Sequence, residues 1–216
     1  MSARTLHGYY RSSASYRVRI ALNLKGLDYD QIFIHLRKGE QFTPEYTALN
    51  PQQQLPTLIE DDAAPLIQSP AILEYLEEVH PQPPLLPGDP AGRARVRAIA
   101  MAVGCDIHPL NNLRVLKYLR GELKTPEDAV RDWIHNWIRL GFEAVETLLA
   151  RSSETGTFCH GANATHADIY LAPQVYNAER FDYPMERHPT IARVTASAME
   201  HDAFARAYPD RQPDAE

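Results

Sequence analysis

Residues 80–90 read HPQPPLLPGDP and contain five prolines and one glycine. Proline has no backbone N–H and a fixed φ, so this stretch forms neither a helix nor a central strand. We expect an extended connector over residues 81–90. It separates a first domain, residues 1–80, from a second, residues 91–216. The length of 216 residues falls between one and two domains of about 150 residues each.

Short patterns of mixed type precede the connector. Strands are predicted over residues 5–9, 29–35, 57–60 and 65–67, and helices over 15–25 and 69–79. Gly26 ends the first of these helices, whereas Ser69 caps the second and Pro70 is its first helical residue. The predicted order is strand, helix, strand, then strand, strand, helix, so the first domain is α+β.

Long periodic segments without glycine clusters follow the connector. They predict helices over residues 91–120, 126–150, 165–180 and 188–208, so the second domain is all-α. Pro109 lies inside the first of these helices, where it removes one backbone hydrogen bond, and we expect the helix to bend there.

The charge balance and the cysteine count exclude several classes of protein. The chain has 22 Lys and Arg against 28 Asp and Glu, or 22 − 28 = −6 with histidine neutral, and a nucleic-acid binder needs clustered positive charge instead. Cys105 and Cys159 form no disulfide framework. Cys105-x-x-His108 has the spacing of two metal ligands, but no second pair completes a site, so we expect no metal.

The distribution of apolar residues along the chain indicates the cellular location of the protein. No apolar run approaches the length of about 18 residues that a membrane helix needs, and the N-terminus lacks the apolar segment of a secretory signal. We therefore expect no membrane association and a cytoplasmic protein.

The first chemically informative segment is YRSSASYRVRIAL at residues 10–22, which is rich in hydroxyls where a strand gives way to a helix. A helix N-terminus carries unpaired N–H groups and about half a positive charge. A hydroxyl placed there donates to a thiolate and keeps it ionised. The alternative is that Ser12, Ser13 or Ser15 only caps the helix.

Two further segments lie near the predicted second pair of strands. A cis bond at Leu55-Pro56 would leave the Leu55 backbone free to pair with an extended peptide, whereas a trans bond would make an ordinary strand entry. Gln68 and Ser69 supply an amide and a hydroxyl at a helix N-terminus, which suits a carboxylate, or form a plain cap.

The second domain offers polar groups at two places. His108 and Asn112 are four residues apart on the predicted long helix and share a face, where they either reach into a cleft or bond another helix. Thr165 and Asp168 have the spacing of a capping box that starts a buried helix. Arg180 closes the same segment, where it either serves a site or compensates a helix C-terminus.

Together these motifs resemble the zeta-class glutathione transferases, a family with a thioredoxin-like domain followed by a helical domain. The run RSSASYRVRIALNLKGLDYD at residues 11–30 matches the family signature, with Ala14 where the family commonly has cysteine and Tyr16 where it has tryptophan. The segments around Pro56, His108 and Arg180 follow in family order, so the resemblance covers nearly the whole chain.

The resemblance implies a set of site residues. Ser12 would face the sulfur of glutathione, and the remaining glutathione contacts would be Ser13, Ala14, Gln41, Leu55, Pro56, Gln68, Ser69, His108 and Asn112. The residues implied for the substrate and the reaction are Arg11, Arg114 and Arg180 together with Ser12. Because Ala14 has no thiol, a mechanism that uses a protein cysteine at that position is excluded.

The resemblance also implies an activity and a partner. The family isomerises a maleyl β-diketo acid, a dianion, to its fumaryl isomer, and it does so as a homodimer with glutathione as coenzyme. Maleylacetoacetate, from aromatic amino-acid catabolism, is the expected substrate. The alternatives are maleylpyruvate as substrate, a conjugating or dehalogenating transferase, and a glutathione-binding module without turnover.

Overall fold

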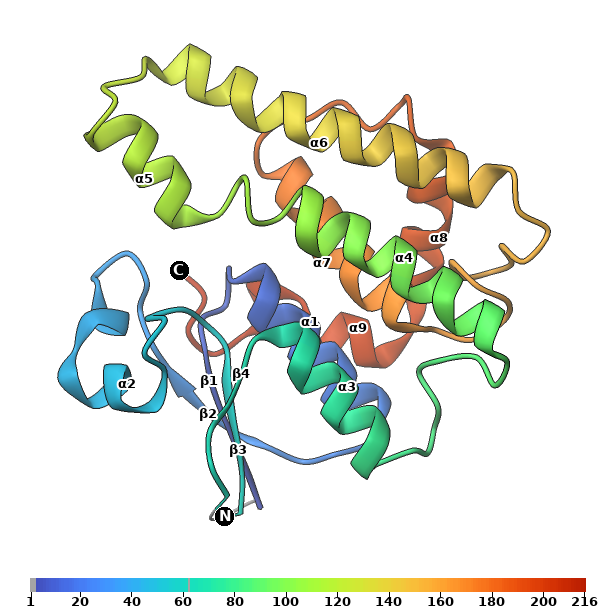
Figure 1. Ribbon diagram of the computed structural model, residues 1–216, viewed down its shortest axis with the longest axis horizontal. Coiled ribbons are helices and arrows are strands. Elements are labelled where there is room, and N and C mark those ends of the chain that lie inside the picture. The colour runs from blue at the N-terminus through green and yellow to red at the C-terminus, as the bar shows by residue number, and fades with distance from the viewer. Residues whose placement is uncertain (1–2, 62) are drawn as a thin grey trace. The chain divides into compact units, whose positions relative to one another are not determined.

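The computed structural model describes residues 3–61 and 63–216, which form two compact units (Figure 1). The first unit comprises the described residues up to Pro84 together with Glu200–Glu216. The second unit comprises Leu85–Met199. The last residues of the chain, which the sequence places in the helical domain, therefore pack with the first unit.

A four-stranded sheet forms the centre of the first unit. Its strands are β1 (Arg4–Gly8), β2 (Asp30–Phe33), β3 (Thr57–Glu60) and β4 (Leu66–Ile67), in the order β2-β1-β3-β4. β1 runs parallel to β2 and antiparallel to β3, which pairs antiparallel with β4. All four strands occur where the sequence predicts them, β2 being shorter at both ends.

Helices cover this sheet on two sides. α1 (Ser13–Leu24) and α3 (Ser69–Val79) lie on one side, and α2 (Pro44–Leu49) lies on the other (Figure 1). The short helix α9 (Asp202–Ala207) packs against α1, and Asn23 Nδ2 donates to Ala203 O at 3.0 Å. This packing is why the chain's end belongs to the first unit.

The first unit corrects three details of the sequence prediction. α1 starts at Ser13 rather than residue 15, with Ser12 as its cap. Ser69 is the first residue of α3 and not its cap, which is Gln68. The prediction also missed α2, although Thr43 caps it by accepting from Tyr46 N at 3.3 Å and Pro44 follows the cap, both being helix-start signals.

The strand register brings several loops to one end of the sheet. His7, at the end of β1, pairs with Thr57, at the start of β3, and Thr57 pairs with Ile67, at the end of β4. Gly8 pairs with Phe33, at the end of the parallel strand β2. The segments that follow β1, β2 and β4 and the segment that precedes β3 therefore meet at this end.

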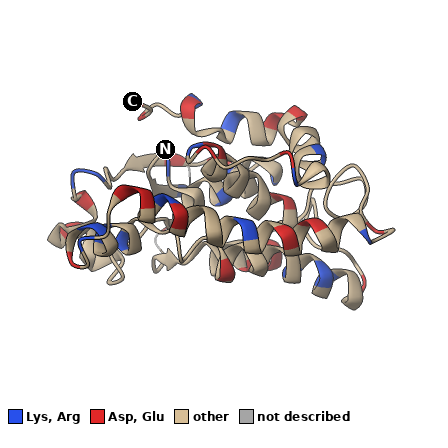
Figure 2. Cartoon of the chain, turned by 90° about the horizontal axis from the view of Figure 1, so that it is seen from above, with Lys and Arg blue, Asp and Glu red and all other residues tan. Residues whose placement is uncertain are grey.

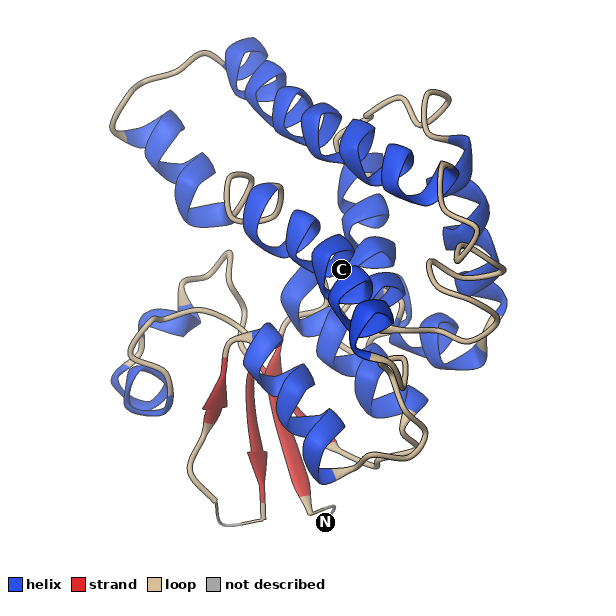
Figure 3. Cartoon of the chain, turned by 45° about the vertical axis from the view of Figure 1, so that its right-hand side comes forward, coloured by secondary structure: helices blue, strands red, loops and turns tan. Residues whose placement is uncertain are grey.

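The described residues of the second unit form helices and loops, with no strand (Figure 3). The helices are α4 (Pro90–Asp106), α5 (Leu113–Gly121), α6 (Glu127–Ala150), α7 (His166–Glu179) and α8 (Pro189–Glu200). α7 is the core helix and is buried on nearly all sides. Its predicted capping box is confirmed, because Asp168 Oδ2 accepts from Thr165 N at 2.9 Å.

Two predicted long helices are broken in the structure. The chain leaves the helix after Asp106 and begins a new one at Leu113, so residues 91–120 do not form one bent helix. Pro109 prevents continuation, and Asn112 caps the next helix by accepting from Arg114 N at 3.1 Å. In the same way, His201 caps α9 and divides the predicted helix over 188–208.

Figure 2 shows acidic and basic residues interspersed along the helices. Within residues 3–61 and 63–216, no helix is both long and apolar enough to cross a membrane.

Gly141 in α6 makes room for the turn that separates α4 from α5. A Cβ at this position would lie 2.2 Å from Cδ1 and Cγ1 of Ile107, a fully buried side chain. The close approach seats Ile107 against α6 and fixes the start of the turn that carries His108.

We predict that Gly141→Ala destabilises the protein by about 1–3 kcal/mol, because the added methyl group overpacks the site. Gly121→Ala is the matched control, since a Cβ there meets nothing within 4 Å. It should leave the free energy of unfolding unchanged or raise it by a few tenths of a kcal/mol. Thermal and urea unfolding of both variants measure the difference. Equal midpoints for the two variants would show that this packing is not tight.

Candidate functional site

Ser12 lies at the end of the loop between β1 and α1. Its N–H donates to Tyr9 O at 3.0 Å, its carbonyl accepts from Tyr16 N at 2.8 Å, and its Oγ accepts from Ser15 N at 3.2 Å. The capping role considered from the sequence is therefore real. The hydroxyl is half-buried, and its hydrogen is available to donate to another group because Oγ acts as acceptor in the cap.

The first turn of α1 offers a positive end to an anion. The N–H groups of Ser13 and Ala14 have no acceptor within the helix because they belong to its first turn. No acidic residue stands in this turn, so side chains do not neutralise the partial positive charge of the helix N-terminus. Ser13 and Ala14 are 6% and 8% exposed, which shields this charge from water and strengthens it.

Arg19 is the residue that fixes the loop before Ser12, and the sequence prediction did not single it out. Its guanidinium is buried and donates to Tyr10 O at 3.0 Å, to Tyr9 O at 3.5 Å and to Ala207 O at 3.1 Å. A charged residue in the otherwise apolar run VRIAL was the available signal.

Two neighbours of Ser12 complete this loop. Arg11 is half-buried, and its guanidinium carbon lies 5.0 Å from the centre of the Tyr10 ring. Burial raises the pKa of Tyr9 to about 12, so its phenol stays protonated at neutral pH. Tyr9 therefore supplies no phenolate, and Ser12 remains the hydroxyl at the helix start.

The segments beside β3 and β4 reach the same end of the sheet. The Leu55-Pro56 peptide bond is cis, which is the first of the two alternatives that the sequence left open. The ladder of β3 starts at Thr57, so the Leu55 peptide lies beyond the strand pairing.

Gln68 and Ser69 stand at the N-terminus of α3. Gln68 has φ 68° and ψ 112°, a conformation that costs a residue with a side chain about 1–3 kcal/mol and is typical of functional sites. Its Nε2 donates to Gln52 Oε1 at 2.6 Å. The first turn of α3, like that of α1, contains no acidic residue. A carboxylate would be accepted here without like-charge repulsion from the turn.

Gln41 reaches this region from the segment after β2. It lies in a 3₁₀ turn, η1 (Glu40–Phe42), and is 4% exposed. Among the described residues, its buried Oε1 has no hydrogen-bond partner. A buried carbonyl oxygen without a partner is costly, so this oxygen can accept a hydrogen bond from a further donor.

The second unit carries His108, Asn112 and Arg114 on and after the turn between α4 and α5. The prediction that His108 and Asn112 share a helix face is wrong, because both lie in the turn. His108 N donates to Val103 O at 3.0 Å, and Arg114 is exposed in the first turn of α5. Contacts from α6 hold the turn, with Trp133 Nε1 donating to Leu110 O at 3.0 Å.

Arg180 lies elsewhere in the second unit, as the C-cap of α7. The side chain is exposed, and its guanidinium carbon lies 5.5 Å from the centre of the Phe181 ring and 5.9 Å from that of Tyr176. An aromatic face attracts a nearby cation and holds it in place without neutralising its charge.

The two cysteines have different surroundings. Cys159 is fully buried, and burial raises the pKa of its thiol well above the ordinary value. Cys105 is exposed, and its Sγ donates to Met101 Sδ at 3.7 Å. Within the described ranges, no group of three or more His, Cys, Asp or Glu side chains is placed to hold a metal ion.

Comparisons with known proteins agree with this geometry. Residues 2–78 match the model of the glutathione S-transferase N-terminal domain. The chain is 50% identical over 209 residues to a maleylpyruvate isomerase of a Ralstonia species, covering 97% of this chain and 98% of the relative. It is also 50% identical over 211 residues to a maleylacetoacetate isomerase of Pseudomonas aeruginosa, covering 97% of each.

Solved structures show the same relationship. The holo structure of a bacterial zeta-class maleylpyruvate isomerase has a TM-score of 0.96 and 48% identity, covering 98% of this chain and 100% of the other. A maleylacetoacetate isomerase of Methylobacterium extorquens, with bound malonate and glutathione, has a TM-score of 0.95 and 40% identity, covering 98% and 99%. The thioredoxin-like unit, the helical unit and these matches over nearly the whole length show that the chain belongs to the zeta-class glutathione transferase family.

Proposed function

We propose that this protein catalyses the glutathione-dependent cis–trans isomerisation of maleylacetoacetate to fumarylacetoacetate. The observation that carries the proposal is Ser12, which caps a helix whose first turn has no acidic residue, at the sheet end where the other candidate segments meet. Relatives that are half identical over nearly the whole chain bear the names of maleylacetoacetate and maleylpyruvate isomerases.

The first unit has the groups that glutathione requires. The residues proposed to bind it there are Ser12, Ser13, Ala14, Gln41, Leu55, Pro56, Gln68 and Ser69. An extended γ-glutamyl peptide presents N–H groups for the buried Gln41 Oε1, a backbone for the Leu55 peptide, and a carboxylate for the α3 N-terminus. The bound malonate and glutathione in the Methylobacterium relative support both the coenzyme and a dicarboxylate substrate.

Residues of the second unit are also proposed to bind the ligands. His108 and Asn112 offer an imidazole and an amide to glutathione, and Arg114 and Arg180 offer guanidinium groups to the substrate. We assign glutathione binding chiefly to residues 1–80 and substrate binding chiefly to residues 91–216, with residues 81–90 as linker. Family membership further supports a homodimer, and the sequence supports a cytoplasmic location.

The reaction needs a nucleophile and a place for negative charge. When bound, glutathione supplies a thiol that adds to the double bond, allows rotation about the resulting single bond, and leaves again. Ser12 donates its hydroxyl hydrogen toward the sulfur, and the α1 N-terminus stabilises the negative charge there. Cys159 does not serve instead, because it is buried with a raised pKa, and Ala14 leaves the motif position without a thiol.

Arginine side chains suit the substrate, which carries two carboxylates. Guanidinium groups bind carboxylates through two parallel hydrogen bonds and remain charged at all relevant pH values. Arg11, Arg114 and Arg180 are proposed to hold the two ends of the dianion and to stabilise the enolate as its charge develops. This assignment explains why a chain of net charge −6 accepts an anion.

We predict that maleylacetoacetate is turned over only when glutathione is present, and that glutathione is not consumed. The measurement follows both substrates, maleylacetoacetate and maleylpyruvate, side by side with and without glutathione. A difference in substrate chain length should give a preference of about tenfold or more for maleylacetoacetate, because small differences in binding contacts are worth about 1–3 kcal/mol.

Three results would change this reading. A preference for maleylpyruvate would leave the proposed reaction unchanged and make maleylpyruvate the substrate. Stoichiometric loss of glutathione into an adduct would indicate a conjugating or dehalogenating transferase. Failure on both substrates, with glutathione still bound, would leave a binding module without turnover.

A second prediction concerns Arg180. Arg180→Ala should lower kcat/KM by about tenfold or more, which corresponds to about 1.4 kcal/mol of lost transition-state stabilisation. Arg139→Ala is the control, because it removes a partly exposed cation from the same unit, where Arg139 pairs with Glu143 at 2.9 Å. Steady-state kinetics of both variants test whether Arg180 contributes to the reaction. Equal kcat/KM for the two would remove Arg180 from the site.

A further inference from the structure

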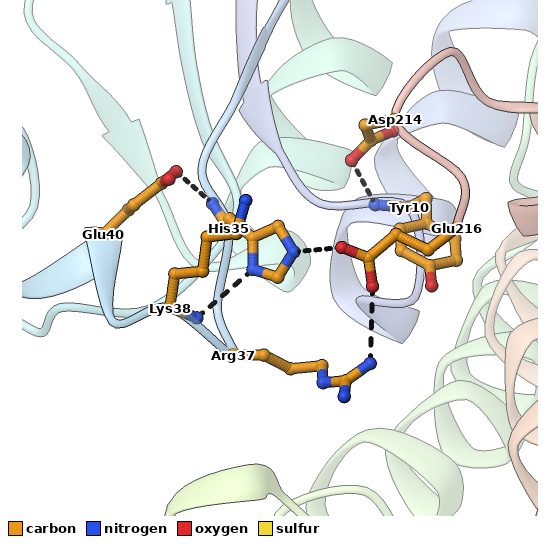
Figure 4. A network of polar contacts seen from close by, with 7 residues as sticks. All are labelled: Tyr10, His35, Arg37, Lys38, Glu40, Asp214 and Glu216. Carbon is orange, nitrogen blue, oxygen red and sulfur yellow. Dashed lines mark hydrogen bonds and ion pairs between the residues drawn. The ribbon is translucent and has the colours of Figure 1, made fainter.

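Charged side chains hold the two peptide groups that flank Tyr10. Arg19 Nη2 donates to Tyr10 O at 3.0 Å. Tyr10 N donates to Asp214 Oδ2 at 2.9 Å (Figure 4). Tyr10 is 1% exposed and stands two residues before Ser12. Its orientation sets where Arg11 and Ser12 emerge from the loop.

The segment that carries Asp214 is anchored on either side of this residue. Gln212 Nε2 donates to Arg206 O at 2.8 Å and to Tyr208 O at 2.9 Å. Glu216 binds His35 Nε2 at 2.5 Å and Arg37 Nη1 at 3.3 Å (Figure 4). Residues 212–216 therefore cross the end of the sheet with Asp214 held between two anchors.

The second anchor lies on the segment that leads to Gln41. His35 Nδ1 accepts from Lys38 N at 3.2 Å, so Nε2 carries the hydrogen and donates to Glu216. This hydrogen bond lowers the pKa of Glu216 below its ordinary value. Glu40 then accepts from His35 N at 2.6 Å, one residue before Gln41 (Figure 4). The same stretch of chain thus touches both loops that carry proposed glutathione contacts.

The carboxylate of Asp214 is only partly satisfied by hydrogen bonds. Asp214 Oδ1 is buried, and among the described residues it has no hydrogen-bond partner. Burying a carboxylate oxygen without a partner destabilises a fold. The residue does bind one buried backbone N–H, which would otherwise remain unsatisfied next to the site.

We infer that Asp214 is a positioning residue for the isomerisation: it holds the Tyr10 amide so that Arg11 and Ser12 keep their places at the N-terminus of α1. The inference rests on the proposed function, because it takes Ser12 and Arg11 as the groups that face glutathione and substrate. In this proposal Asp214 itself contacts neither glutathione nor the substrate.

The test compares Asp214→Ala with Asp214→Asn and with Asp202→Ala. The asparagine variant keeps an oxygen that accepts from Tyr10 N but has no charge. Asp202→Ala is the matched control, since Asp202 belongs to the same unit and makes an exposed ion pair to Arg206 at 2.7 Å. Amide hydrogen exchange at Tyr10, kcat/KM and the unfolding midpoint are measured for each variant.

Asp214→Ala should speed exchange at Tyr10 about tenfold and lower kcat/KM about tenfold, because a hydrogen bond to a charged acceptor is lost. Asp214→Asn should restore both to within about threefold of the unchanged protein, since an amide oxygen still accepts the bond. Asp202→Ala should alter neither.

Two results would overturn the inference. One is an Asp214→Ala variant with unchanged exchange or unchanged kcat/KM. The other is an Asp214→Asn variant as impaired as the alanine variant, which would mean that the accepting oxygen is not what matters. If the unsubstituted protein turns over neither substrate, the proposed function fails, and the exchange comparison alone decides whether Asp214 holds the loop.

Discussion

A buried guanidinium organises the first unit. Arg19 is 1% exposed and donates to carbonyls of Tyr9, Tyr10 and Ala207, which lie at opposite ends of the sequence. A buried charge is tolerated only where its N–H groups are satisfied. The loop before α1 and the helix α9 must therefore be in place together, and the unit cannot be completed without residues 200–216.

This constraint fixes the loop before α1 at the end of the sheet where the proposed site lies. In a thioredoxin-like sheet, the ends of β1 and β4 and the start of β3 meet in register, so the helices α1 and α3 begin side by side at that end. Neither helix has an acidic residue in its first turn. We propose that the partial positive charges of both helix ends face the same ligand.

Local signals sufficed for much of the fold and for part of the site. The strands, the capping box of Thr165 and Asp168, and the position of Ser12 follow from short patterns with direct physical causes. Helix α2 had a usable signal in Thr43 and Pro44. The break at residues 107–112 did not, because Pro109 permits either a bend or an end, and Asn112, Trp133 and Gly141 decide between them. The bond between Tyr10 and Asp214 spans 204 residues, and no local pattern contains it.

We propose that Ser12 and the first turn of α1 lower the pKa of the glutathione thiol. A pH titration of the ultraviolet absorbance of the bound thiolate measures this directly. The account predicts a pKa of about 7 or below in the unsubstituted protein, against about 8.5 for a free thiol, and a value about one higher with Ser12→Ala. Thr43→Ala, which removes the equivalent cap of α2, should leave the thiol pKa unchanged. Equal thiol pKa values with and without the Ser12 hydroxyl would contradict the account.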